Sequence, residues 1–271
     1  MKPLSAFPAD ALRRIRGVLF DIDDTLTTEG RLTADAYAAL NALKTAGFIC
    51  IPITGRPAGW CDHIARMWPV DGVVGENGAF YFYFDPAEKK LRQRFIKDER
   101  TRAQDREKIA AVAAKILAAV PGTALASDQN YREADIAIDF CEDVPALTRT
   151  EIERIKTLME SEGLTAKISS IHVNGWLGDY DKLSTSKLFM RERFGIDLDS
   201  TKEQFVFVGD SPNDAPMFGY FPYSFGVANV KEFEDVLTSK PAYVTPSRCG
   251  AGFGELAVLL VSAAEANKRG K

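Results

Sequence analysis

The sequence of 271 residues contains few of the residues that build zinc sites or disulfide frameworks. It has two histidines, which are isolated from each other, and four cysteines, none of which belongs to a close C-x-x-C pair. These numbers argue against a structural zinc site and against a disulfide-stabilised fold. We therefore expect the four cysteines to be reduced thiols, namely Cys50, Cys61, Cys141 and Cys249.

The sequence also lacks an excess of positive charge and a long apolar run. Its formal net charge is −4, which argues against a nucleic-acid binder with a basic surface and against electrostatic attachment to anionic lipid. Residues 1–16 contain no apolar stretch of signal-peptide length, and the apolar run at 256–263 is too short to span a bilayer. We interpret the chain as a cytoplasmic protein without a nucleic-acid or membrane partner; its oligomeric state is not indicated.

What the sequence does contain is ordinary globular composition arranged in an α/β rhythm. Hydrophobic residues make up 46% and charged residues 27%, enough for one large domain or a core with a smaller domain. Short apolar runs at 17–20, 48–53 and 71–75 alternate with helical patterns that begin near Thr33 and Pro57. Strands in this order, separated by helices, predict a parallel sheet with right-handed crossovers.

The rhythm changes in the middle of the chain and then resumes. Residues 79–96 resemble an antiparallel hairpin, and they are followed by two helical patterns, a half-buried strand at 134–139 and a strand at 167–177. A helix from 184, an apolar strand at 205–209 and further strands and helices restore the α/β pattern. The prediction is a Rossmann-like α/β core, residues 1–84 and 179–271, with an inserted α+β cap, residues 85–178.

Acidic and hydroxyl side chains follow the predicted core strands. Asp21 and Asp23 come after the first strand, Thr54 after the second, and Asp210 and Asp214 after the late strand. In an open α/β sheet, ligands bind beyond the carboxyl ends of the strands, so these distant residues are expected to meet at one edge.

The predicted cluster has the chemistry of a phosphate site. Carboxylates that lie close together need a cation, and oxygen ligands favour a hard ion such as Mg²⁺. A phosphate monoester would face Mg²⁺, the ammonium of Lys182, the hydroxyl of Thr54 and backbone N–H groups. Asp21 could then attack phosphorus, while Asp23 protonates the leaving oxygen and later activates water.

Four segments resemble the signature motifs of the haloacid dehalogenase superfamily. They are residues 21–26 (DIDDTL), residues 54–56 (TGR), Lys182 and residues 209–214 (GDSPND). The insert resembles the larger α/β cap of the subclass that includes Cof-like sugar phosphatases, sucrose-phosphate phosphatase, mannosyl-3-phosphoglycerate phosphatase and phosphomannomutase. Residues 75–79 and 226–229 add to the likeness.

The resemblance implies a role for each matching residue. Asp21 would be the nucleophile and a metal ligand, and Asp23 the acid/base that also binds Mg²⁺ through its carbonyl. Asp210 would complete the metal site, and Asp214 would support it from behind. The residues that would bind the phosphate are Thr54, Gly55, Lys182 and Asn213, although Asn213 fits a simple turn residue equally well.

Two positions complicate the match. Asp24 stands where many Cof-like members carry glycine, and Lys187 is a second lysine near the expected position. Lys182 is preferred because it comes just before the predicted helix, where the superfamily has its lysine.

The sequence therefore predicts a Mg²⁺-dependent phosphatase that hydrolyses a small phosphate monoester, a sugar phosphate or related metabolite, through an aspartyl-phosphate. One alternative is a phosphohexomutase of the same superfamily, and a more distant one is a non-catalytic, metal-dependent binding protein. P-type ATPase-like chemistry is disfavoured. The sequence does not identify the phosphate ester.

Three features outside the motifs have competing interpretations. The aromatic run at 80–84 fits sheet core better than a sugar-stacking surface. His63 fits an ordinary position on a helix surface. Arg132, in a predicted cap loop, is a candidate for binding a second anionic group of the substrate, with a purely structural role as the favoured alternative.

Overall fold

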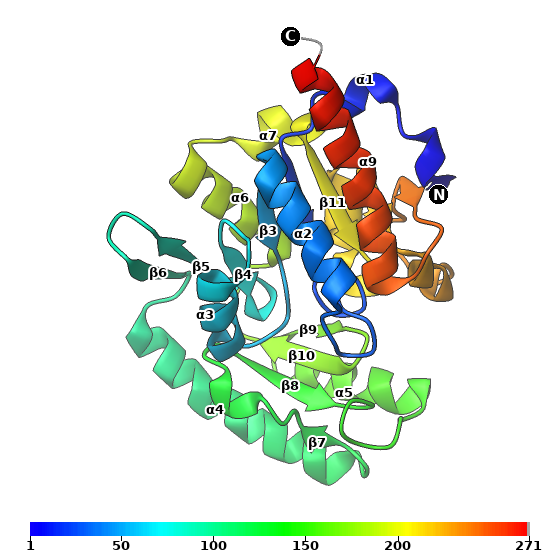
Figure 1. The fold of residues 1–271 in the computed structure, drawn as a ribbon. Coiled ribbons are helices and arrows are strands. Elements are labelled where there is room, and N and C mark those ends of the chain that lie inside the picture. Colours follow the sequence, from blue (N-terminus) through cyan, green and yellow to red (C-terminus); the bar gives the residue numbers. More distant parts are fainter. Residues whose placement is uncertain (270–271) are drawn as a thin grey trace.

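The computed structural model describes residues 1–269 and is organised around a six-stranded parallel sheet (Figure 1). The strand order is β1-β13-β12-β11-β2-β3, and each neighbouring pair runs parallel. The strands are β1 (Lys2–Pro3), β2 (Gly17–Phe20), β3 (Ile49–Pro52), β11 (Phe205–Gly209), β12 (Ser224–Gly226) and β13 (Tyr243–Val244). The α/β fold with a parallel core sheet, predicted from the apolar runs, is confirmed.

Helices cover both faces of this sheet. On one face, α2 (Ala34–Ala46) and α9 (Cys249–Arg269) lie side by side in front of the strands (Figure 1). On the other, α6 (Lys182–Phe194) and α8 (Ala215–Tyr220) pack on residues such as Phe207. The boundaries of α2 follow from its caps, because Thr33 accepts a hydrogen bond from the N–H of Ala36 and Gly47 adopts φ +99°.

Helix α9 is a core helix, although residues Cys249–Asn267 are long and apolar enough to cross a membrane by length and composition alone. The apolar run at 256–263, judged from sequence too short to span a bilayer, is part of this longer stretch. Its residues Phe253, Leu256 and Leu260 are buried against α2 and the sheet. This packing accounts for the apolar residues on one face of the helix, whereas Val258 on another face is 66% exposed.

A three-stranded antiparallel sheet adjoins the central sheet and corrects one prediction. Strand β4 (Val73–Gly75), expected in the parallel sheet, does run parallel to β3, but an isolated bridge between Ile53 and Val74 is their only ladder contact. It pairs instead with β5 (Phe80–Asp85), which pairs with β6 (Lys90–Phe95). Residues 76–78 have positive φ and reverse the chain. The stacked, buried rings of Phe80 and Phe82 show that the aromatic run is sheet core.

A second antiparallel sheet forms the cap in the order β7-β8-β10-β9. Its strands are β7 (Ala124–Leu125), β8 (Asp135–Asp139), β9 (Thr165–Ile168) and β10 (His172–Trp176). The predicted single strand at 167–177 is thus two strands with a turn between them. Strand β8 is buried throughout, not half-buried: buried Arg132 pairs with the carboxylate of Asp135, and the carboxylate of Asp139 accepts a hydrogen bond from the N–H of Cys141.

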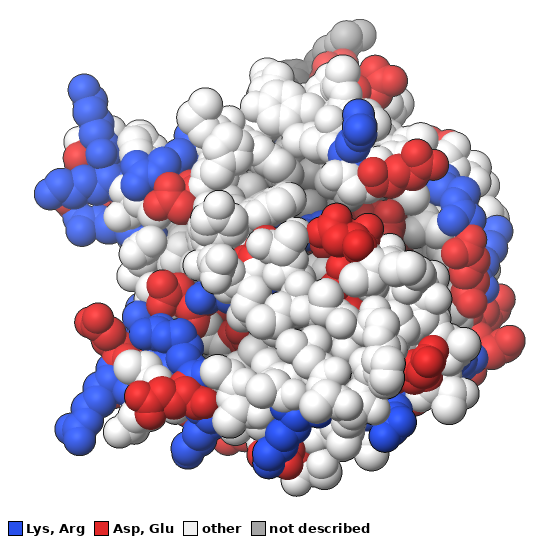
Figure 2. Space-filling view, turned by 90° about the horizontal axis from the view of Figure 1, so that it is seen from below, with Lys and Arg blue, Asp and Glu red and all other residues white. Residues whose placement is uncertain are grey.

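Two helices cover this cap sheet, α4 (Glu99–Ala119) and α5 (Arg149–Ser161), and they contribute Ile116 and Ile155 to a separate apolar core. Viewed from the cap side, basic and acidic side chains are interspersed around a largely uncharged centre (Figure 2). The cap limits at residues 85 and 178 stay a prediction. The remaining helical segments are α1 (Ala9–Leu12), α3 (Ala58–Met67), α7 (Leu198–Thr201) and short 3-10 turns at Leu4–Ala6, Glu76–Gly78, Gln129–Tyr131, Lys202–Gln204, Pro212–Asp214 and Ala228–Phe233.

Candidate active site

The carboxyl ends of neighbouring parallel strands bring three buried carboxylates together. Asp21 follows β2 directly and Asp210 follows β11, and the N–H of Asp21 donates to the carbonyl of Val208 at 2.9 Å. Asp214 lies at the end of the 3-10 turn after β11. One carboxylate oxygen from each of the three acids lies within 4.8 Å of the others. The structure therefore brings together residues that are almost 200 positions apart.

Lys182 adds one positive charge to this cluster. Its Nζ lies 2.8 Å from Oδ1 of Asp21 and 2.8 Å from Oδ1 of Asp214, and it is the first residue of α6. Lys187, the alternative lysine, instead lies 2.7 Å from Asp199 on the outside of the same helix. Lys182 is thus the lysine that reaches the predicted nucleophile.

The described residues that form this cluster carry more negative than positive charge. Burial raises the pKa of Asp21 to about 8, although Lys182 opposes the change. Burial and the neighbouring Asp214 and Asp21 raise the pKa of Asp210 well above its usual range. Three carboxylates with one ammonium leave an excess of negative charge, so the site fits a further cation. An all-oxygen donor set fits a hard divalent ion such as Mg²⁺.

The carboxylate of Asp214 is fully occupied by protein partners. Besides Lys182 on Oδ1, its Oδ2 accepts hydrogen bonds from the N–H groups of Asp210 at 3.1 Å and Ser211 at 3.4 Å. A Cβ on Gly209 would lie 2.4 Å from the same oxygen, so this approach requires glycine. The contacts brace the loop after β11 and match the supporting position expected of Asp214.

Asp210 is held by side chains that the sequence analysis did not assign. Thr25 Oγ1 donates to its Oδ1 at 3.1 Å, and Asn229 Nδ2 lies 3.3 Å from its Oδ2. Asn229 also donates to the carbonyl of Asp24 at 3.0 Å, which links the loops after β2 and β12. Both lie in segments noted for their likeness to the superfamily, which was the available signal.

Asp23 lies at the mouth of the site and is paired with Arg56. Arg56 Nε donates to the two carboxylate oxygens of Asp23 at 3.0 and 3.1 Å. The next residue, Asp24, has φ +54°, a left-handed conformation that favours glycine and that aspartate tolerates better than most residues. This geometry explains why a glycine would suit the position of Asp24.

Thr54 and Gly55 lie in the turn after β3. Thr54 is buried, and its Oγ1 accepts a hydrogen bond from the N–H of Arg56 at 3.0 Å, which leaves the hydroxyl proton available to donate. The carbonyl of Gly55 accepts a hydrogen bond from Arg132 at 2.9 Å. Arg132 also pairs with Asp128 and Asp135, so it has the structural role and not the substrate-binding one.

A small cavity of about 20 Å³ lies between these residues and the cap. Its floor includes Asp21, Asp23 and Gly55, and Asn213 also lines it, with its Oδ1 accepting from Ser211 Oγ at 2.8 Å. Its roof is formed by cap residues that the sequence analysis did not predict: Ser169, Ser170, Ile171, His172 and Asn174. This volume holds about one water molecule, so the cap lies closed over the nucleophile.

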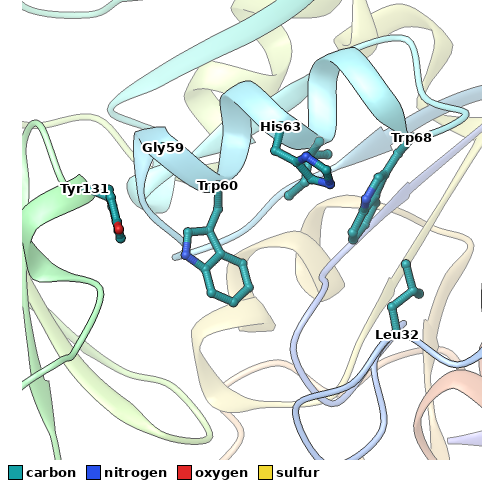
Figure 3. A pocket seen from close by; sticks show the side chains of 7 residues that line it. Leu32, Gly59, Trp60, His63, Trp68 and Tyr131 are labelled. Atoms are coloured by element: carbon teal, nitrogen blue, oxygen red, sulfur yellow. The ribbon is translucent and has the colours of Figure 1, made fainter.

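A wider depression of about 260 Å³ adjoins the cavity, and both are lined by Asp23, Arg56 and Ile171. A separate groove of about 540 Å³ runs along α3 (Figure 3). That groove is lined by Leu32, Gly59, Trp60, His63, Ile64, Trp68 and Tyr131. His63, one of these lining residues, is exposed on the helix surface, as expected. The ring of Trp60 lies 4.6 Å from the guanidinium of Arg56.

Comparison with known sequences agrees with this geometry. The family of haloacid dehalogenase-like hydrolases matches residues 18–110. A phosphoglycolate phosphatase of Archaeoglobus fulgidus is 27% identical over 233 residues, which cover 83% of this chain and 91% of that protein.

Solved structures show the same fold. A Thermoplasma acidophilum protein aligns with a TM-score of 0.66 and 17% identity, over 91% of this chain and 98% of that one. The sucrose-phosphatase of Synechocystis, solved with sucrose and phosphate, aligns with a TM-score of 0.61 and 15% identity over the same shares. The superfamily resemblance, the capped α/β fold and the assignment as a phosphoric monoester hydrolase are confirmed.

Proposed function

We propose that this chain is a haloacid dehalogenase-like hydrolase, namely a Mg²⁺-dependent phosphatase that acts on a small phosphate monoester through an aspartyl-phosphate on Asp21. The observation that carries the proposal is the pairing of buried Asp21 with Lys182 at 2.8 Å, beside the carboxylate of Asp210. A carboxylate fixed in this way at a strand end is a positioned nucleophile beside a cationic phosphate contact.

In the first half of the reaction, a carboxylate oxygen of Asp21 attacks phosphorus. The bond from phosphorus to the ester oxygen breaks, and Asp23 gives that oxygen a proton, so that an alcohol leaves. Lys182, the hydroxyl of Thr54 and the amide of Asn213 are positioned to bind the phosphoryl oxygens. Closure of the cap residues over the cavity keeps bulk water away from this step.

In the second half, Asp23 takes a proton from a water molecule that attacks the phosphorus. The bond to Asp21 breaks, which restores the carboxylate and releases inorganic phosphate. A cavity with room for about one water supports a controlled entry of this molecule.

The carboxylates of Asp21 and Asp210, with the main-chain carbonyl of Asp23, are the proposed ligands of Mg²⁺. The ion, when bound, supplies positive charge beside the transferring phosphoryl group. Asp214 and Asn229 do not bind it in this proposal; they hold the loop after β11 and the carboxylate of Asp210 in place.

The proposed substrates are sugar phosphates and related metabolites. Sucrose-phosphatase and phosphoglycolate phosphatase are among the proteins with the same fold or a similar sequence, which makes hexose phosphates, sucrose phosphate and phosphoglycolate the first esters to test. The polar roof of the cavity, with Ser170 and Asn174, suits a leaving group that carries hydroxyl or carboxyl groups.

The test is release of inorganic phosphate by purified protein from a broad panel of phosphate esters, with Mg²⁺ and with EDTA. The wild type should release phosphate in Mg²⁺, and Asp21→Asn should fall to background, because the covalent route is lost. Asp10→Asn, which changes an exposed aspartate of α1, is the matched control and should keep full activity. Near-native turnover by Asp21→Asn would rule out the aspartyl-phosphate mechanism.

The same assay separates the alternatives. A phosphohexomutase would convert one hexose phosphate into an isomer and release little inorganic phosphate. A non-catalytic binding protein would turn over no ester in the panel.

A further inference from the structure

Arg56 connects the predicted acid/base residue with the cap. It lies in the turn between β3 and α3, and its side chain is 5% exposed. Its Nε and Nη2 contact Asp23 at 2.9 to 3.1 Å. Nη1 of the same guanidinium contacts Asp128 at 3.3 Å, and Nη2, which is shared with Asp23, contacts Glu142 at 2.8 Å. Both of these acids belong to the inserted segment.

Glu142 is held firmly in its position. Its N–H donates to Oδ1 of Asp139 at 2.8 Å, so the turn at the end of β8 fixes its backbone. Its carboxylate lies 2.8 Å from Arg56 Nη2, and Oε2 lies 2.9 Å from Nε2 of buried His172. His172 and then Arg56 lower the pKa of Glu142 to about 2, so the group is a carboxylate across the working pH range.

We propose that Glu142 is a positioning residue, which orients Arg56 and thereby fixes the carboxylate of Asp23 for proton transfer when the cap is closed. The proposal rests on the proposed function of Asp23 as acid and base. A guanidinium is a planar fork, so partners on one edge restrict the direction of the other edge. When the cap moves away, Arg56 loses two of its three carboxylate partners and Asp23 is no longer held between core and cap.

Proton transfer depends on how precisely the carboxylate of Asp23 is positioned. General acid–base catalysis contributes on the order of 10²–10⁴ in rate, and a displacement of about 1 Å can cost up to about 10²-fold. Because Asp23 delivers its proton to the leaving oxygen, poor positioning should matter most when that oxygen is a weak leaving group. A residue that merely stabilised the closed cap would affect all substrates alike.

The experiment compares two substrates in wild type, Glu142→Gln and Arg56→Lys. One substrate is the best alkyl phosphate from the panel, whose alkoxide needs a proton, and the other is p-nitrophenyl phosphate, whose phenolate does not. The parameter is kcat/KM, which reports the steps up to the first departure of the leaving group. We expect kcat/KM to fall on the order of 10-fold or more for the alkyl phosphate and less than about 3-fold for the aryl phosphate.

The matched control is Glu162→Gln, which removes a cap carboxylate whose partner is Lys115 at the surface. It should leave both values unchanged. Equal losses of kcat/KM for the two substrates in Glu142→Gln, or no loss for either, would overturn the positioning role. Thermal unfolding of each variant detects a folding defect. If Glu142→Gln is defective, the comparison of the two substrates is made with Arg56→Lys instead.

Failure of the proposed function gives a different result. In that case the wild type turns over neither ester, or Asp21→Asn retains activity, before any variant of the cap is considered.

Discussion

Two groups of buried charge meet at Asp23, and they are built in different ways. The first, around Asp21, takes its three carboxylates and Lys182 from the core strands and helices. The second, around Arg56 and Arg132, joins core to cap, because each of these arginines bonds to the other side: Arg56 to Glu142, and Arg132 to the carbonyl of Gly55.

The Asp21 group carries the proposed chemistry, whereas the Arg56 group links the site to the position of the cap. The Asp21 group is complete whatever the position of the cap, and its excess negative charge fits a cation. In the Arg56 group, the bonds from Arg56 to Asp128 and Glu142 and from Arg132 to Gly55 require contact between core and cap, so these bonds report closure. We therefore expect changes in the first group to remove activity or cation binding, and changes in the second to alter closure, stability and proton transfer.

The largest expected effect falls on Asp23, which lies between the two groups. Asp23→Asn should lower kcat on an alkyl phosphate by about 10²–10⁴-fold, because the acid and base are lost while the nucleophile is kept. Steady-state kinetics on folded protein, verified by circular dichroism, measures this loss. A kcat within a few-fold of wild type would remove Asp23 from the mechanism.

The next effect concerns stability, and it comes from Arg132, which lies where core and cap meet. Arg132→Met should reduce the free energy of unfolding by about 3–5 kcal/mol, because it removes the ion pair of buried Asp135 and one of the two arginine partners of buried Asp128. Arg106→Met is the control: its partner Glu133 is 42% exposed, so its loss should cost less than about 1 kcal/mol. Urea unfolding compares the two, and similar costs would mean that the Arg132 bonds contribute little.

A smaller effect distinguishes the cation site without an activity assay. Mg²⁺ that binds only the folded protein should raise the unfolding free energy by about 2.7 kcal/mol at 100 times its Kd. Asp210→Asn should lose most of this gain, since a ligand charge is removed. Differential scanning calorimetry in EDTA and in Mg²⁺ measures both. If Asp210→Asn gained as much as wild type, the ion would bind elsewhere.

The smallest effect is a change with pH in the free energy of unfolding, caused by Glu76, which bonds to both core and cap. Glu76 accepts hydrogen bonds from the N–H groups of Ala58, Glu133 and Ala134, and burial, together with Asp135, raises its pKa to about 8. The folded state therefore binds more protons than the unfolded state above the ordinary glutamate pKa of 4.5, so Glu76 makes stability fall as pH rises toward 8.

Glu76→Gln should remove this contribution, whatever it costs at a single pH. Its unfolding free energy should fall less steeply than that of wild type between pH 5 and pH 8 in urea titrations. Parallel slopes for the two proteins would show that Glu76 does not titrate in this range.

The core of this protein could be predicted from sequence because local signals agree with each other there. Apolar runs that end at Asp21 and Asp210 fix both a buried strand and the position of the carboxylate after it. Thr33 and Gly47 mark the ends of α2 through cap chemistry that is local in the chain. Strand β4 was misplaced because its pairing depends on the reversal at residues 76–78, which hydrophobic pattern does not reveal.

The cap side of the site was not predictable in the same way. Glu142 and His172 are 30 positions apart in unremarkable polar sequence, and their contact depends on the pairing of β8 with β10. Arg56 was noted as part of a motif, but its partners across the joint come from the packing of two sheets. Polar residues in loops carry no periodicity that would mark them as neighbours.

The sequence by itself determined the parallel core and the set of residues at its strand ends, since strand direction places every carboxyl end on one edge. Tertiary structure alone decided how core and cap meet at Arg56, Arg132 and Glu76, because those contacts join segments through space. The physical reason is that backbone and apolar patterns depend on residues a few positions apart in the chain. The pairing of buried charges depends instead on their distance in space and on desolvation.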